Sequence, residues 1–351
     1  MGDVCVEFKM LALAGLLGLM AAGSVVFLSD ETTNDAEASD DAGLDDLTAE
    51  DDPTQPENQL SDTSGEDTAD TDTAGSETGA LPPDLILAGN DTDETIDGGD
   101  GNDQINGYDG DDTVSGGLGD DTLHGYGGDD LVQGDADNDL LHGEYGEDTL
   151  SGGSGDDEMY GHFGSDQMQG DDGNDTLYGG QDTDSLDGGD GDDALHGGYG
   201  NDTLVGGAGE DTLFGGRDND LIIGQDDDGS ASGPDYLNGG EGNDTIVAGE
   251  GDIVTAGSGA DQIILGDWIL DGEAANIVDF DPSQDRLLIS WDLQGDPDPQ
   301  IEVQPDPNNA NLNRVTINGE EIALLRGDAQ VLASDIMVVD QSEVSAFSLA
   351  S

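Results

Sequence analysis

The chain has 351 residues, of which 84 are acidic and only 5 are Lys or Arg, so its formal net charge at pH 7 is −79. Nucleic acid and anionic lipid repel such a polyanion, and we therefore expect its partners to be cations. Low hydrophobicity with high charge favours disorder when composition alone is considered, but a strict repeat in the middle of the chain predicts a folded region. The single Cys excludes an internal disulfide framework.

An uncharged apolar run occupies residues 10–28, close to the roughly 20 residues of a membrane-spanning helix. Small residues near its end, such as Ala22 and Ser24, also suit a signal peptidase. Residues 1–28 are therefore expected to be a transmembrane anchor or a signal peptide. Lys9 before the run and acidic residues after it place the body of the chain outside the cytoplasm. Because acids are unusual at the start of a leader, Met10 is a second candidate start.

Residues 29–83 are a mixture rich in Asp, Glu, Thr and Ser, with no aromatic residue. Such a segment is expected to be a disordered, self-repelling linker. Carboxylates on a mobile chain lack fixed geometry, so we expect no catalytic role here.

A nine-residue unit, Gly-Gly-x-Gly-x-Asp-x-aliphatic-x, repeats from residue 89 without a slip. Each unit begins with glycine, and its sixth position is Asp except in the first unit, which has Glu94. Fifteen aliphatic residues recur nine positions apart: Ile96, Ile105, Val114, Leu123, Val132, Leu141, Leu150, Met159, Met168, Leu177, Leu186, Leu195, Leu204, Leu213 and Ile222.

The first six residues of each unit are expected to form a tight turn, because glycine permits backbone angles that a Cβ forbids. Asp or Asn at the fifth position fits this expectation, since both tolerate the left-handed conformation. The last three residues suit a short strand whose aliphatic side chain faces inward. Single units cannot bury that side chain. Two units are therefore expected to make one coil of about eighteen residues, and the coils to pair as parallel strands in two thin sheets.

Such a core is slender. Burying one Leu-sized side chain contributes roughly 1.5 to 3 kcal/mol, whereas ordering nine residues costs on the order of 1 to 2 kcal/mol for each. Carboxylates stacked about 4.8 Å apart also repel one another. A hard divalent cation offsets both costs. Calcium fits best because it accepts about six to eight oxygen ligands in flexible geometry, whereas magnesium demands stricter geometry and zinc or copper prefers His or Cys.

The repeat resembles that of the RTX (repeats-in-toxin) hemolysin-type calcium-binding proteins over about residues 88–264. The resemblance implies an all-β fold, a calcium-dependent parallel β-roll or nonapeptide solenoid, at residues 84–264. It also implies that the sixth-position aspartates and the turn carbonyls hold several Ca2+ ions. These aspartates are Asp103, Asp112, Asp121, Asp130, Asp139, Asp148, Asp157, Asp166, Asp175, Asp184, Asp193, Asp202, Asp211 and Asp220.

The pattern has departures that bear on the predicted sites. The fourth glycine is replaced by Thr92, Asp137, Asp182 and Asp218, so those turns are expected to hold weaker or differently shaped sites. After Ile222 an insertion of about six residues interrupts the period, and one later unit is a residue short. Four further aspartates fall at the sixth position once the period resumes: Asp235, Asp244, Asp252 and Asp261.

Residues 265–340 abandon the nonapeptide and alternate like short strands, in the segments NIVDF, DRLLISW, QIEVQ, NRVTI, EIALL and DIMVV. We expect a small β-rich cap here that closes the hydrophobic end of the roll. The tail at residues 341–351 is a candidate export signal.

One outer face of the roll is predicted to be aromatic. Ninth-position residues eighteen apart form this stripe: His124, His142, Tyr160, Tyr178, His196 and Phe214. The first interpretation is a side-chain ladder that stiffens the sheet. A surface for glycans or a protein partner is the second, and zinc at His124 and His142 is the third.

The sequence therefore predicts a calcium-binding structural or surface protein, secreted or anchored by residues 10–28 with its body outside the cytoplasm. RTX proteins imply export through dedicated machinery and folding where calcium is abundant. No HExxH or G-x-S-x-G motif is present, and we expect no enzyme activity. The alternatives are an accessory module for a separately encoded enzyme or toxin, or a carbohydrate-binding or adhesive roll.

Overall fold

The computed structural model describes residues 84–225, 233–270, 273–307, 309, 311–326 and 331–341. The predicted anchor or signal peptide, the acidic linker and residues 342–351 of the tail lie outside the described residues. Among the residues described, no helix is long and apolar enough to cross a membrane.

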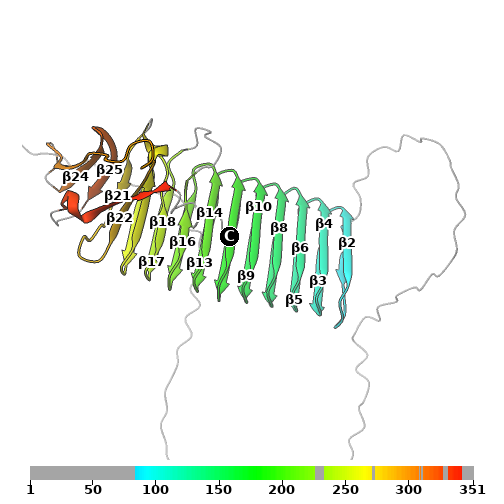
Figure 1. The fold of residues 1–351 in the computed structure, drawn as a ribbon. Coiled ribbons are helices and arrows are strands. Elements are labelled where there is room, and N and C mark those ends of the chain that lie inside the picture. Colours follow the sequence, from blue (N-terminus) through cyan, green and yellow to red (C-terminus); the bar gives the residue numbers. More distant parts are fainter. Residues whose placement is uncertain are drawn as a thin grey trace, which may run out of the picture. The chain divides into compact units, whose positions relative to one another are not determined.

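The described residues form two sheets whose strands alternate along the chain as far as residue 291 (Figure 1). The first is a 14-stranded sheet in the order β1 (Ile86–Ala88), β3 (Gln104–Asp109), β5 (Thr122–Gly127), β7 (Leu140–Tyr145), β9 (Glu158–Phe163), β11 (Thr176–Gln181), β13 (Ala194–Tyr199), β15 (Thr212–Arg217), β17 (Tyr236–Glu241), β19 (Ile253–Ser258), β21 (Ala275–Ile277), β25 (Glu320–Arg326), β24 (Leu312–Ile317) and β23 (Ile301–Pro305).

The second is a 12-stranded sheet in the order β2 (Thr95–Asp100), β4 (Thr113–Leu118), β6 (Leu131–Ala136), β8 (Thr149–Ser154), β10 (Gln167–Asp172), β12 (Ser185–Asp190), β14 (Thr203–Ala208), β16 (Leu221–Ile223), β18 (Thr245–Val247), β20 (Gln262–Gly266), β22 (Arg286–Trp291) and β26 (Ile336–Asp340). Two short 3-10 turns, η1 (Asp267–Ile269) and η2 (Ala333–Asp335), lie in the C-terminal part.

Neighbouring strands in the repeat region are parallel and offset by eighteen residues, so that Leu177 pairs with Leu195 and Tyr178 with His196. Two nonapeptides therefore make one coil, as the periodicity predicts. The predicted all-β parallel roll is confirmed. The insertion is absorbed without loss of register, because Leu213 pairs with Leu237 across a longer coil and Ile246 with Ile263 across a shorter one.

The division of each unit into turn and strand differs from the prediction. Strand β8 runs from the seventh position through the third position of the next unit, so Gly152 and Gly153 lie in the strand and only positions four to six turn. Gly153 still pairs in the sheet, with Asp135. Its positive φ lets the strand continue in the same register past Gly152, which has no partner in the ladder. The expectation of a six-residue turn and a three-residue strand was wrong.

The aliphatic residues of the repeat form one continuous core between the sheets. The fourteen from Ile105 to Ile222 are at most 3% exposed. The first of the predicted series, Ile96, is only partly buried, because strand β2 has a single neighbour, β4, and its coil ends the roll. A terminal coil can cover its core residue from one side only.

The C-terminal segments predicted as strands all contain strands, and they extend the two sheets of the roll. β22 and β26 continue the 12-stranded sheet in parallel, whereas β21 and β25 continue the other sheet, to which β24 and β23 add antiparallel. Phe280 is buried, and the Trp268 indole N–H donates to the carbonyl of Ala248 at 2.9 Å. The core thus passes from the roll into this region without a break.

Shortening a core side chain should show how much each buried aliphatic residue of the repeat contributes to the free energy of unfolding. Leu177→Ala removes a fully buried side chain and should lower the free energy of unfolding in saturating calcium by about 2–5 kcal/mol. Leu131→Ala makes the same change at a side chain that is 36% exposed and should cost less than about 1 kcal/mol. Denaturant unfolding of both variants checks this; equal losses would contradict the proposed core.

Candidate metal sites in the turns

The sixth-position aspartates form two rows, one along each edge of the roll. In each row the backbone N–H of one Asp donates to Oδ1 of the Asp one coil later, as from Asp157 to Asp175 at 2.8 Å and from Asp148 to Asp166 at 2.9 Å. The first row contains Asp103, Asp121, Asp139, Asp157, Asp175, Asp193, Asp211, Asp235 and Asp252. The second contains Asp112, Asp130, Asp148, Asp166, Asp184, Asp202, Asp220, Asp244 and Asp261.

All eighteen predicted ligands are at most 3% exposed. Their Oδ1 atoms accept the backbone hydrogen bonds between coils. Most of their Oδ2 atoms are buried with no hydrogen-bond donor in the described part of the chain. This holds for Asp103, Asp112, Asp121, Asp130, Asp139, Asp148, Asp157, Asp166, Asp175, Asp184, Asp193, Asp202, Asp220, Asp244 and Asp261. A buried carboxylate oxygen without a partner is costly, so these atoms mark places where a cation would stabilise the fold.

In the units that begin with glycine and keep the nine-residue length, the Oδ2 atom lies beside that first glycine. A Cβ built on Gly170 would lie 2.3 Å from Asp175 Oδ2 and 2.3 Å from the carbonyl oxygen of Gly188, which begins the unit one coil later. A side chain at Gly170 would clash with both oxygen atoms. The first-position glycine therefore allows a carboxylate oxygen and a backbone carbonyl to converge.

The fifth position has a different role from the one predicted. The fifth-position residues Asn174 and Asp156 do not have a positive φ. The non-glycine residues that do have one stand at other positions, such as Tyr108 at the second and Asp137 at the fourth. The fifth-position side chain instead accepts a hydrogen bond from the backbone of the next coil, as from Asn174 N–H to Asp156 Oδ1 at 2.9 Å. Asn and Asp are therefore favoured as acceptors, and the left-handed explanation was wrong.

Burial changes the acidity of the rows. It raises the pKa of Asp139, Asp184 and Asp220 to about 8. At Asp184 the charges of Asp202 and Asp166, one coil away on either side, raise the pKa further, whereas the hydrogen bond from the Asp166 backbone lowers it. Without a cation the row can hold its negative charge only at high cost.

The donor set fits calcium. Carboxylate and carbonyl oxygens are the ligands that calcium takes, and the sequence has no Lys or Arg between residues 10 and 216 that could neutralise the rows instead. The oxygen atoms named here would hold the ion. The ion would supply positive charge between stacked carboxylates and, when bound, turn its binding free energy into folding free energy.

The units that depart from the pattern keep most of this geometry. Asp137, Asp182 and Asp218 adopt positive φ at the fourth position, as the glycines there do, so their turns keep the common shape. Asp252, in the shortened unit, differs because its Oδ2 accepts the Gly249 N–H at 2.5 Å. At the start of the roll, the Glu94 N–H donates to Asp112 Oδ1.

One row extends beyond the residues that the sequence analysis selected. Oδ1 of Asp285, which is 5% exposed, accepts the Asp261 N–H at 3.3 Å, and Asp279 accepts the N–H groups of Ala256 and Gly257. Asp285 stands two residues before the buried Leu287, the spacing between Asp and aliphatic residue in the repeat. That local match could have identified it.

A family model described as the RTX calcium-binding nonapeptide repeat (four copies) matches residues 88–123, 124–159, 160–195, 196–231 and 230–263, about half of the chain. The chain belongs to this RTX family. Its repeats bind calcium in a β-roll, a structural calcium-binding fold. Among curated proteins, none matches the chain at a significant level.

Neutralising two acids of one row should weaken calcium binding through the turns specifically. Asp157→Asn with Asp175→Asn keeps the side-chain shape and the Oδ1 acceptor but removes charge from buried positions one coil apart. We expect the calcium concentration at the folding midpoint to rise by about threefold or more. Calcium titrations followed by circular dichroism measure it.

The matched control is Asp172→Asn with Asp190→Asn, which removes the same charge from exposed residues that pair one coil apart. Its midpoint should change little. If the two pairs of substitutions have equal effects, bulk charge governs binding and the turn geometry does not.

The calcium-free chain should gain β structure as the pH falls. The raised pKa values mean that the folded state binds more protons than the unfolded state, so the free energy of unfolding falls as pH rises from about 4 to about 8. Circular dichroism after removal of metal should show more β structure at about pH 5 than at about pH 8. Saturating calcium should reverse the trend, because ligand carboxylates must be deprotonated. The same trend in both conditions would contradict this account.

Proposed function

We propose that this protein is an exported structural or surface protein whose roll folds when calcium fills the turns outside the cytoplasm. The buried Oδ2 atoms of the two aspartate rows carry the proposal. When they are ionised they need a cation in order to be buried, and the chain offers almost no basic side chains for this purpose. In this proposal the predicted eighteen aspartates are the calcium ligands.

If folding requires calcium, the chain would be synthesised unfolded in the cytosol and would fold only after export. In a calcium-poor cytosol the carboxylates within each row would repel one another and the repeat region would stay expanded. Extracellular calcium modules bind at about 10⁻⁴ to 10⁻³ M. The apolar run at residues 10–28 supports export or anchoring, and Lys9 supports an outward body. The candidate signal at residues 341–351 would engage export machinery.

The roll itself is the functional product in this proposal, and no catalytic role is assigned to it. An accessory role beside a separately encoded enzyme or toxin is the alternative, and genes neighbouring this one would separate the two. A second candidate function is adhesion to glycans, favoured by exposed aromatic side chains of the 14-stranded sheet and its turns, among them Tyr145, Tyr199 and Tyr236. Such rings suit stacking against sugars.

The full chain should change from coil to β structure on addition of calcium. In chelator we expect an expanded chain, since stacked carboxylates repel, and at millimolar calcium a compact β protein. Far-ultraviolet circular dichroism and the hydrodynamic radius measure the change. Magnesium at equal concentration is the control for ionic strength and should be a poor substitute. A roll that is fully folded in chelator would refute the proposed switch.

A further inference from the structure

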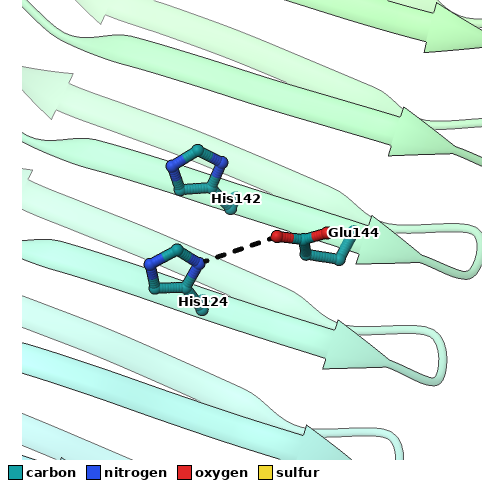
Figure 2. A group of neighbouring side chains, drawn as sticks. All are labelled: His124, His142 and Glu144. Atoms are coloured by element: carbon teal, nitrogen blue, oxygen red, sulfur yellow. Dashed lines mark ion pairs between the residues drawn. The ribbon is translucent and has the colours of Figure 1, made fainter. Parts of the chain in front are cut away.

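Three of the chain's four histidines lie together on the outer face of the 14-stranded sheet. They come from three consecutive strands of that sheet: His124 from β5, His142 from β7 and His162 from β9. Glu144, also on β7, lies beside them, and Figure 2 shows its carboxylate facing the imidazoles of His124 and His142.

The array arises from a regular relation within the coil. A ninth-position side chain reaches the second-position residue of the next coil, twenty residues on. His124 Nδ1 lies 3.9 Å from Glu144 Oε1, and His142 Nδ1 lies 3.0 Å from His162 Nε2. On the other sheet the same relation joins Ser115 to Asp135 at 2.7 Å. Contacts between ninth and second positions therefore occur on both sheets. The histidine cluster differs only in having His and Glu at these positions.

We propose that His124, His142 and Glu144, with His162 as a fourth ligand, bind one divalent transition metal ion of the zinc type. One ligand atom from each of the first three lies within 4.8 Å of the others. Zinc–ligand bonds of about 2.0–2.2 Å place tetrahedral ligand atoms roughly 3.4 Å apart. The His142–His162 pair, at 3.0 Å, is already close to that spacing, and small side-chain rotations would bring His124 and Glu144 to it.

The nitrogen atoms of the cluster are suited to accept a metal. His124 Nδ1 is buried and has no hydrogen-bond partner among the described residues. Imidazole suits zinc, copper and nickel, whereas calcium prefers oxygen.

Aromatic neighbours hold the rings in place. The His124 and His142 rings stack with centroids 4.5 Å apart and an angle of 2° between planes. Tyr160 stacks on His142 at 5.0 Å, and Tyr126 lies tilted against His124 at 5.4 Å. This packing limits the entropy lost when a metal orders the side chains. The side chains of the stripe do stack from His124 to His196, and this stacking positions the ligands of the proposed site.

The test uses the full chain folded in saturating calcium, with Zn²⁺ as the titrant in calorimetry. We expect one zinc ion per chain that excess calcium does not displace. His124→Gln combined with His142→Gln should lower zinc affinity by at least about tenfold. Substitution of Co²⁺ should add a visible absorption band from imidazole ligands, which the double variant should lose.

His196→Gln is the matched control, because His196 lies in the same aromatic row, stacked on Tyr178, but outside the cluster. Its zinc affinity should match that of the unaltered protein. Unchanged zinc affinity in the double variant, or an equal loss in His196→Gln, would overturn the proposal. If the double variant fails to fold in calcium, Glu144→Gln decides alone: a weakened zinc affinity supports the site, and an unchanged one overturns it.

Discussion

Carboxylates stacked one coil apart repel one another, and in this roll they are also buried. At a spacing of about 4.8 Å the repulsion between unit charges is strong in a poorly solvated turn, and burial removes the water that would screen it. Within a row, an Asp such as Asp175 donates and accepts one hydrogen bond, which satisfies Oδ1 but leaves Oδ2 beside a glycine carbonyl. A cation bound there would offset the repulsion and supply the partner that Oδ2 lacks.

We propose that the rest of the roll depends on that interaction. The core contributes about one aliphatic side chain per nine residues, too little to offset the ordering of the backbone alone. Fifth-position acceptors such as Asn174 tie successive coils together along the turns, so ordering one coil favours the next. Strands β20, β22 and β26 then continue the sheet, and buried residues such as Ile269 and Phe280 extend the core beyond the last repeat.

Much of this architecture could be predicted because a nine-residue period forces every unit into one environment. The period placed Leu177 inside, Asp175 in the turn and Tyr178 outside, and the register of the sheets agrees. The extent of the strands could not be read from the glycines, because their freedom suits a kinked strand as well as a turn. The cluster around Glu144 could not be predicted from the nine-residue repeat or the eighteen-residue coil, because it joins residues that are twenty positions apart.

The most direct test of the central claim is the location of calcium in crystals of the folded protein, determined from its anomalous scattering. We predict two lines of calcium peaks along the edges of the roll, each within bonding distance of the Oδ2 atom of a sixth-position aspartate such as Asp175 and of a first-position glycine carbonyl. Peaks confined to exposed acids, or turns that remain ordered with no calcium beside Oδ2, would contradict the claim.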